Sequence, residues 1–115
     1  MTTEQQGQPI GTIRIAPQVL ATIVRLTAQS VAGVAHLGQG GHGVNLSRNV
    51  AQNEPGVRVK VRDNQVTADL YIVVMPETNM RKVGNEVQQQ VTEALIKMVG
   101  MPVEAVNVYV EDVEG

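Results

Sequence analysis

The stretch GQGGHGVN at residues 38–45 is the first place to look for chemistry, because it holds four glycines in eight residues. Glycine-rich loops bind phosphate where their backbone N–H groups converge at the N-terminus of a helix. Gly38, Gly40 and Gly43 match the G-x-G-x-x-G spacing of dinucleotide-binding loops, but a polar segment ending at Pro55–Gly56 follows where a helix should begin. No lysine follows as a P-loop requires. We therefore predict a flexible surface loop over about residues 38–56.

The same glycines also read as G-x-x-G from Gly38 to Gly41, which is the clamp of KH-type RNA-binding modules. That clamp joins two helices and usually carries a basic residue, whereas a predicted strand precedes it here and only His42 and Arg48 lie near. The net charge of −2 gives no electrostatic reason to expect a nucleic acid. RNA binding through this loop stays an alternative, and nucleic acid is not the expected partner.

The remaining reactive side chains form no recognisable site. His36 and His42 stand six residues apart with no cysteine and no obvious carboxylate partner, which falls short of a zinc site. The chain has no cysteine, so thiol nucleophiles and disulfides are excluded. Neither Ser30 nor Ser47 lies in a G-x-S-x-G elbow. We predict no catalytic residue, no metal and no cofactor, and hence a protein that is not an enzyme.

The elements that would position these residues follow from hydrophobic periodicity. Apolar residues recur at helical spacing in two segments, at residues 17–31 and 80–100. Apolar and polar residues alternate in five segments, at residues 11–15, 33–37, 57–61, 66–75 and 103–113. Each predicted helix has one apolar stripe and most strands have one apolar face. The order β-α-β-β-β-α-β therefore predicts an α+β fold, a two-layer sandwich with both helices on one face of a mostly antiparallel sheet.

Domain organisation and strand register can also be predicted. Residues 1–9 are expected to be a disordered polar leader. Residues 10–115 are expected to form a single domain. The strands at 57–61 and 66–75 are expected to form a hairpin with Asn64 and Gln65 as its loop. That loop pairs three sets of apolar residues, which are Val61 with Ala68, Val59 with Leu70, and Val57 with Ile72.

The sheet face turned away from the helices is the candidate interaction surface. The predicted contact residues are two tyrosines, two cations and two exposed apolar residues, namely Arg58, Lys60, Tyr71, Val73, Met75 and Tyr109. Apolar residues in a row on an outward face are typical of a protein contact. Charge offers a second route to self-association, because a basic row could meet another copy's acidic C-terminal end. The basic row is Arg58, Lys60 and Arg62, and the acidic end is Glu104, Glu111, Asp112 and Glu114.

Five segments carry a family resemblance in the right order, from Gly11 to Val113. They are GTIRIAPQVLATI, VAGVAHLG, GVRVKVRDNQVTADLYIVV, EVQQQVTEALIKMVGMPV and VNVYVEDV. Together they resemble the alkaline shock protein family, also called the envelope stress response (Gls-type) family. One departure is the sequence Met75-Pro76-Glu77-Thr78, which stands where the family usually has a tyrosine–glycine turn.

The resemblance implies a small cytoplasmic protein without enzymatic activity that belongs to the cell-envelope stress response. It implies a scaffold or interaction role at the inner membrane face through a membrane-anchored partner, together with self-assembly into homo-oligomers. It defines no catalytic or ligand-binding residue. The polar N-terminus and the absence of a long apolar run agree with a cytoplasmic chain that does not itself insert into the membrane.

Overall fold

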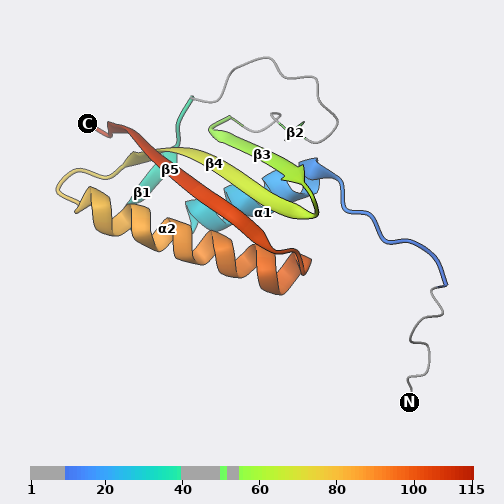
Figure 1. Ribbon diagram of the computed structural model, residues 1–115. Helices are drawn as coiled ribbons and strands as arrows, with labels where there is room; N and C mark the ends of the chain where they lie inside the picture. The colour runs from blue at the N-terminus through green and yellow to red at the C-terminus, as the bar shows by residue number, and fades with distance from the viewer. Residues whose placement is uncertain (1–9, 40–49, 52–54) are drawn as a thin grey trace.

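A computed structural model describes residues 10–39, 50–51 and 55–115 (Figure 1). The predicted leader at residues 1–9 and most of the predicted glycine-rich loop lie outside the described residues. The elements in chain order are α1 (Pro17–Gln29), β1 (Val34–Leu37), β2 (Val50–Ala51), β3 (Val57–Arg62), β4 (Gln65–Val74), α2 (Met80–Ala94), a π-helical turn η2 (Leu95–Val99) and β5 (Val103–Val113).

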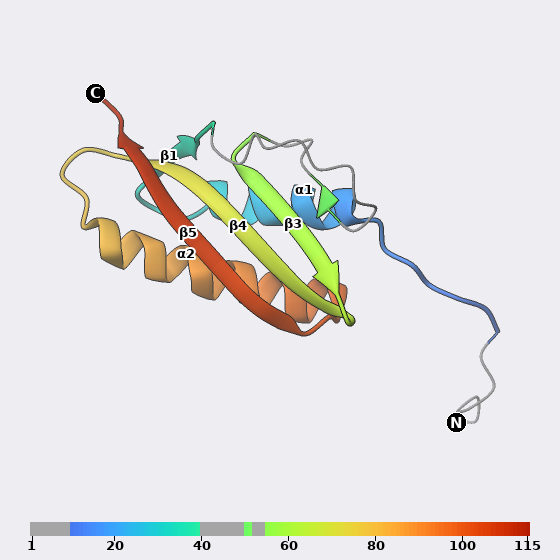
Figure 2. The same cartoon turned by 45° about the horizontal axis from the view of Figure 1, so that its top comes forward.

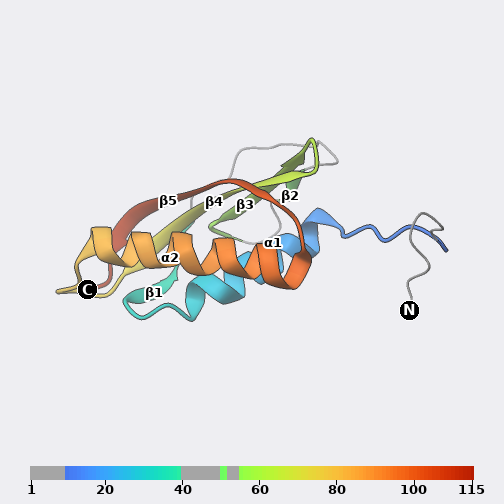
Figure 3. The same ribbon diagram turned by 60° about the horizontal axis from the view of Figure 1, so that its bottom comes forward.

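The two helices cover one face of the sheet and leave the other face open. Figure 3 shows α1 and α2 side by side on the same side of the strands. The core between the layers is almost entirely valine, leucine and alanine, and no polar or charged residue is buried in the described part of the chain. The predicted α+β fold, with both helices on one face of a mostly antiparallel sheet, is therefore confirmed.

Strand β4 is the centre of the sheet. Strands β1 and β3 lie end to end along one of its edges, and both pair antiparallel with it. Strand β5 runs along the other edge and is parallel to β4, with α2 as the crossover between them (Figure 2). Among the described residues nothing pairs with the outer side of β5, so β5 is an edge strand along its whole length.

The predicted register of the β3–β4 hairpin is wrong by two residues. The structure pairs Val57 with Leu70, Val59 with Ala68, and Val61 with Val66. The reason is the turn, which consists of Asp63 and Asn64 with positive φ angles of 54° and 63°. Two-residue hairpin loops favour this left-handed geometry because its twist matches that of the strands. A slip of two residues keeps every side chain on its predicted face.

The predicted strand at residues 11–15 is also wrong. These residues are extended but unpaired, and the side chains of Ile10 and Ile13 are 92% and 91% exposed. A strand requires a neighbour for its backbone hydrogen bonds, and the structure places none beside this segment. Instead, the short strand β2 pairs with the outer edge of β3, so the sheet still has five strands.

The helix ends follow local chemistry. Pro17 begins α1 at a position where its missing N–H costs nothing. Asn79 caps α2, because its side-chain oxygen accepts a hydrogen bond from the Lys82 N–H at 3.0 Å. Gly100 ends the π-helical turn in the left-handed conformation, with φ of 80°. The predicted helices are therefore confirmed, although α1 ends two residues earlier than predicted and the last turn of the second is π-helical.

Replacing Asn79 with alanine is expected to lower the free energy of unfolding by about 1 kcal/mol, because the Lys82 N–H loses its acceptor. Chemical denaturation followed by circular dichroism measures the change. The neighbouring Asn85 lies on the exposed surface of α2 and serves as the control, since Asn85→Ala removes the same amide and no cap. Equal losses in the two variants would contradict a capping role for Asn79.

Candidate functional site

Two stacked tyrosines occupy the open face of the sheet. Tyr71 on β4 and Tyr109 on β5 are direct neighbours in the parallel register, and their ring centroids lie 4.8 Å apart with an interplanar angle of 16°. Tyr71 is half-buried, whereas Tyr109 is 47% exposed. The structure thus brings together the two aromatic residues that the sequence analysis placed on this face.

The backbone of Tyr71 is held by two glycines that come from the two ends of the predicted loop. The Gly38 N–H donates to the Tyr71 carbonyl at 2.7 Å, and the Tyr71 N–H donates to the Gly56 carbonyl at 2.9 Å. A Cβ on Gly56 would lie 2.8 Å from the Gly38 carbonyl oxygen, so the two backbones meet too closely for any side chain. Gly38 and Gly56 are both buried, and they close the base of the loop against β4.

The basic row lies on the same open face, along β3. Arg58 is half-buried opposite Asp69, while Lys60 and Arg62 are exposed. On the β5 side, the Asn107 side-chain amide donates to the Asp69 carboxylate at 2.8 Å. The face therefore has cations along one side and the tyrosine pair over its centre.

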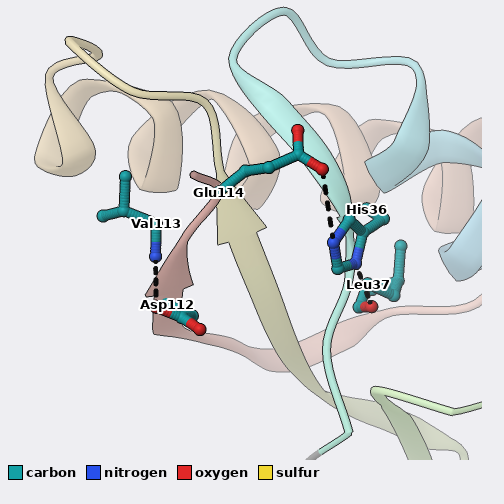
Figure 4. Close-up of polar contacts among 5 residues, drawn as sticks. All are labelled: His36, Leu37, Asp112, Val113 and Glu114. Carbon is teal, nitrogen blue, oxygen red and sulfur yellow. Dashed lines mark hydrogen bonds and ion pairs between the residues drawn. The ribbon is translucent and has the colours of Figure 1, made fainter.

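The two apolar residues predicted for this surface differ in their environments. Met75 is 44% exposed, as the sequence analysis expects, but Val73 is only 7% exposed, so its predicted exposure is wrong. Val73 pairs with His36 of β1 on one side and with Asp112 of β5 on the other. Figure 4 shows Glu114 extending toward His36, with 3.9 Å between Oε2 and Nε2, so these side chains reach toward one another from both sides of β4.

Glu111, which the sequence analysis placed in the acidic end, makes a contact on this face that the sequence analysis missed. Its carboxylate accepts a hydrogen bond from the Gln39 N–H at 2.8 Å, which takes the side chain from β5 across β4 to the end of β1. A Cβ on Gly38 would lie 1.7 Å from the same carboxylate oxygen, so any side chain there would displace the Glu111 carboxylate. No sequence pattern reveals a contact between residues 72 positions apart, because only the fold brings them together.

The described residues on either side of the glycines differ from those that frame a known phosphate clamp. Gly40, Gly41, His42, Gly43, Arg48 and Ser47 lie outside the described residues. Strand β1 precedes the glycines and strand β2 follows them, within the range predicted as loop, whereas two helices flank a KH clamp. At the base of the loop the Gln39 N–H already faces a carboxylate, which repels phosphate.

The other candidate chemical residues are dispersed. The Ser30 hydroxyl donates to the Thr27 carbonyl at 2.7 Å and so serves the end of α1. His36 is an exposed strand residue whose Nδ1 lies 2.9 Å from the Leu37 carbonyl oxygen. Within the described ranges, no three side chains of histidine, aspartate or glutamate gather as metal ligands would.

The described residues line two hollows on the helix side. One of about 700 Å³ lies between the end of α1 and the start of α2, where Glu77, Lys82 and Glu86 mix with apolar residues. The other, of about 420 Å³, follows the contact of α2 with the outer part of β5. The first hollow has acidic and basic groups but no nucleophile beside a base, so it gives no basis for a reaction.

Comparison with known proteins finds a matching family model and two similar curated proteins. Residues 5–115 match the model of the alkaline shock protein 23 family, described as having a cell envelope-related function. The uncharacterized protein YqhY of Bacillus subtilis is 28% identical over 112 residues, covering 96% of this chain and 83% of that protein. The uncharacterized protein Spy1535 of Streptococcus pyogenes is 34% identical over 116 residues, covering 98% of this chain and 84% of that protein.

Solved structures share the fold at low sequence identity. One variant of MamM CTD is 20% identical, with a TM-score of 0.52, and the match covers 84% of this chain and 95% of that one. Another, a nickel form, is 18% identical with the same TM-score, covering 84% of this chain and 99% of that one. At this level of identity the likeness concerns the arrangement of helices and strands.

Proposed function

The chain belongs to the alkaline shock protein 23 family, whose described function is cell envelope-related, and on that premise we propose that it is a non-enzymatic protein-interaction module. Neither the family description nor the curated relatives give any indication of catalytic activity. The described side chains also form no constellation that could carry a reaction. The feature that suits an interaction role is the open face of the sheet.

The open sheet face is the observation that carries this proposal. Its centre is the stacked pair of Tyr71 and Tyr109, and its β3 side carries Arg58 and Lys60. Tyrosine and arginine are the residue types that most often dominate binding energy in protein interfaces. Rings already stacked in the free protein lose little conformational freedom on binding, which favours affinity. Met75 extends the same surface beyond the end of β4.

The partners in this proposal are other proteins, including further copies of the chain. None of the described helices is both long enough and apolar enough to cross a membrane. The family resemblance implies a location at the inner face of the cell membrane through a membrane-anchored partner, and we include it in the proposal. RNA binding, the alternative function, gains no support from the described part of the loop, because the Glu111 carboxylate stands at its base.

The proposal predicts that Tyr109→Glu weakens partner binding at least about 30-fold, which corresponds to about 2 kcal/mol for a central aromatic contact. The partner is first captured by cross-linking in native cells with membranes retained, and its affinity for each variant is then measured by titration. Tyr109 is preferred over Val73 for this test, because a charge at the buried Val73 would disturb the fold itself.

Met98→Glu is the matched control, since Met98 is 70% exposed on the π-helical turn, away from the open face. We expect it to bind like the unmodified protein. If Tyr109→Glu keeps full affinity, the open sheet face is not the interaction surface. If both variants lose affinity equally, the contact lies elsewhere or the charge acts non-specifically.

A further inference from the structure

Residues 10–15 form a strand-like segment without a partner strand. The sequence IGTIRI alternates, with Ile13 and Ile15 on one side and Thr12 and Arg14 on the other. The structure leaves the segment extended and projecting from the body of the protein, as Figures 1 and 2 show. Ile13 is 91% exposed, although isoleucine is a residue type that favours buried strands.

The outer edge of β5 is a strand edge without a neighbour. Residues 105–110 of this strand read AVNVYV and contain neither a charge nor a proline, which are residues that protect an edge from pairing. The Gln88 side chain donates to the Val106 carbonyl at 3.0 Å from α2, so the backbone groups of Val106 point outward. Because alternate residues of a strand point the same way, those of Val108 and Val110 point outward too.

A groove runs beside this edge on the helix side. It is the hollow of about 420 Å³. Its lining combines apolar Met80, Val108 and Val110 with Gly84 and the polar side chains of Arg81, Asn85 and Gln88. Gly84 contributes no side chain, so the groove stays open above Val108, and Val110 remains 38% exposed on what should be the inner face of β5. A strand added to β5 would place every second side chain into this groove, where Met80, Val108 and Val110 offer apolar contacts.

We propose that residues 10–15 of one copy of the chain add as an extra strand to the outer edge of β5 in a second copy. Ile13 and Ile15 then enter the groove beside Gly84, and Arg14 faces the opposite, open side of the sheet. Charge complements this arrangement, because β5 carries three acidic residues and no basic one, whereas the added segment carries only Arg14. Backbone hydrogen bonds supply affinity, and the alternating side chains supply specificity.

The segment cannot reach the β5 edge of its own copy with the same residues. Ile15 lies two residues before the start of α1, a reach of at most about 7 Å. Helix α1 packs against β3, whereas the outer edge of β5 lies two strand spacings, or about 10 Å, beyond β3. Pairing through Ile13 and Ile15 together therefore requires a second copy.

The experiment uses one variant in the donated segment and one in the groove. Ile13→Asn replaces the apolar side chain proposed to contact Val108 and Val110 with an amide. Gly84→Gln fills the groove, where a Cβ meets only Val108 at 4.0 Å and so does not strain the fold. Sedimentation of the full chain is expected to show self-association weakened at least about tenfold in each variant. Ile10→Asn is the matched control, because Ile10 is equally exposed but lies on the other side of the segment.

Mixing the two weakened variants is the decisive step. The Ile13→Asn copy keeps an intact groove and the Gly84→Gln copy keeps an intact segment, so the mixture is expected to regain association as a one-to-one pair. Association of the mixture no stronger than that of each variant alone would overturn the strand inference.

This inference rests on the self-association in the proposed function, and the two can fail separately. If the unmodified protein associates and both variants associate equally well, only the added strand is wrong. If the unmodified protein is monomeric at every concentration, self-association itself is wrong, while partner binding by the open face is still tested through Tyr109.

Discussion

Replacing Leu70 with alanine is expected to lower the free energy of unfolding by about 3–5 kcal/mol, because its side chain fills the centre of the core. Leu70 lies in the middle of β4, the central strand, and is fully buried among the valines of the sheet and both helices. Domains of this size are stable by only about 5–15 kcal/mol, so the loss would be a large share of the total. Urea denaturation measures it.

Leu26 offers the matched control, since it loses the same atoms from a side chain that is 55% exposed on α1. We expect Leu26→Ala to change the free energy of unfolding by no more than about 0.5 kcal/mol. If Leu70→Ala lowers the free energy of unfolding only slightly, the helices do not pack on the inner face of β4 as in this structure. A large loss for Leu26→Ala would mean that this face of α1 is covered in solution.

Periodic patterns made the layered fold predictable. Val83, Val87 and Val91 recur at helical spacing, and all three are buried on the side of α2 that faces the sheet. The alternation in residues 66–74 likewise selects the buried face of β4. These patterns are local consequences of burying one side of an element, so a single sequence reveals them.

Pairing between elements could be predicted less well. The hairpin register depends on whether Asp63 and Asn64 or the next two residues form the turn, and alternation cannot distinguish registers that differ by two. The parallel placement of β5 is equally invisible in its sequence. Residues 11–15 have a strand pattern but no strand, because the pattern states what a segment prefers and not whether a neighbour is present.

The open face shows the same limit at the level of single residues. Tyr71 and Tyr109 were predictable as outward residues, because each alternates with apolar neighbours in its strand. Val73 alternates outward in the same way, yet β1 on one side and the end of β5 on the other bury it. The contact of Glu111 with Gln39 depends on a loop closure that sequence spacing cannot show.

Gly56 is the residue on which the centre of the open face depends most. Its φ of +78° is strained for any other residue, at about 1–2 kcal/mol, and a Cβ would also lie 2.8 Å from the Gly38 carbonyl oxygen and 3.0 Å from the Gly38 nitrogen. Both partners are backbone atoms, so neither can turn away. Gly56→Ala is therefore expected to lower the free energy of unfolding by about 2–4 kcal/mol, measured by urea denaturation.

Gly100→Ala separates the two causes, because Gly100 has a φ of +80° with nothing within 4 Å of its added Cβ. It should lose only the conformational part, about 1–2 kcal/mol. Equal losses at the two positions would contradict the close backbone contact between Gly38 and Gly56. A larger loss at Gly56 would instead tie the base of the loop to the Tyr71 backbone, since the Gly38 N–H and the Gly56 carbonyl both hydrogen-bond to Tyr71. Partner binding should then fall in Gly56→Ala even where the variant remains folded, and stay unchanged in Gly100→Ala.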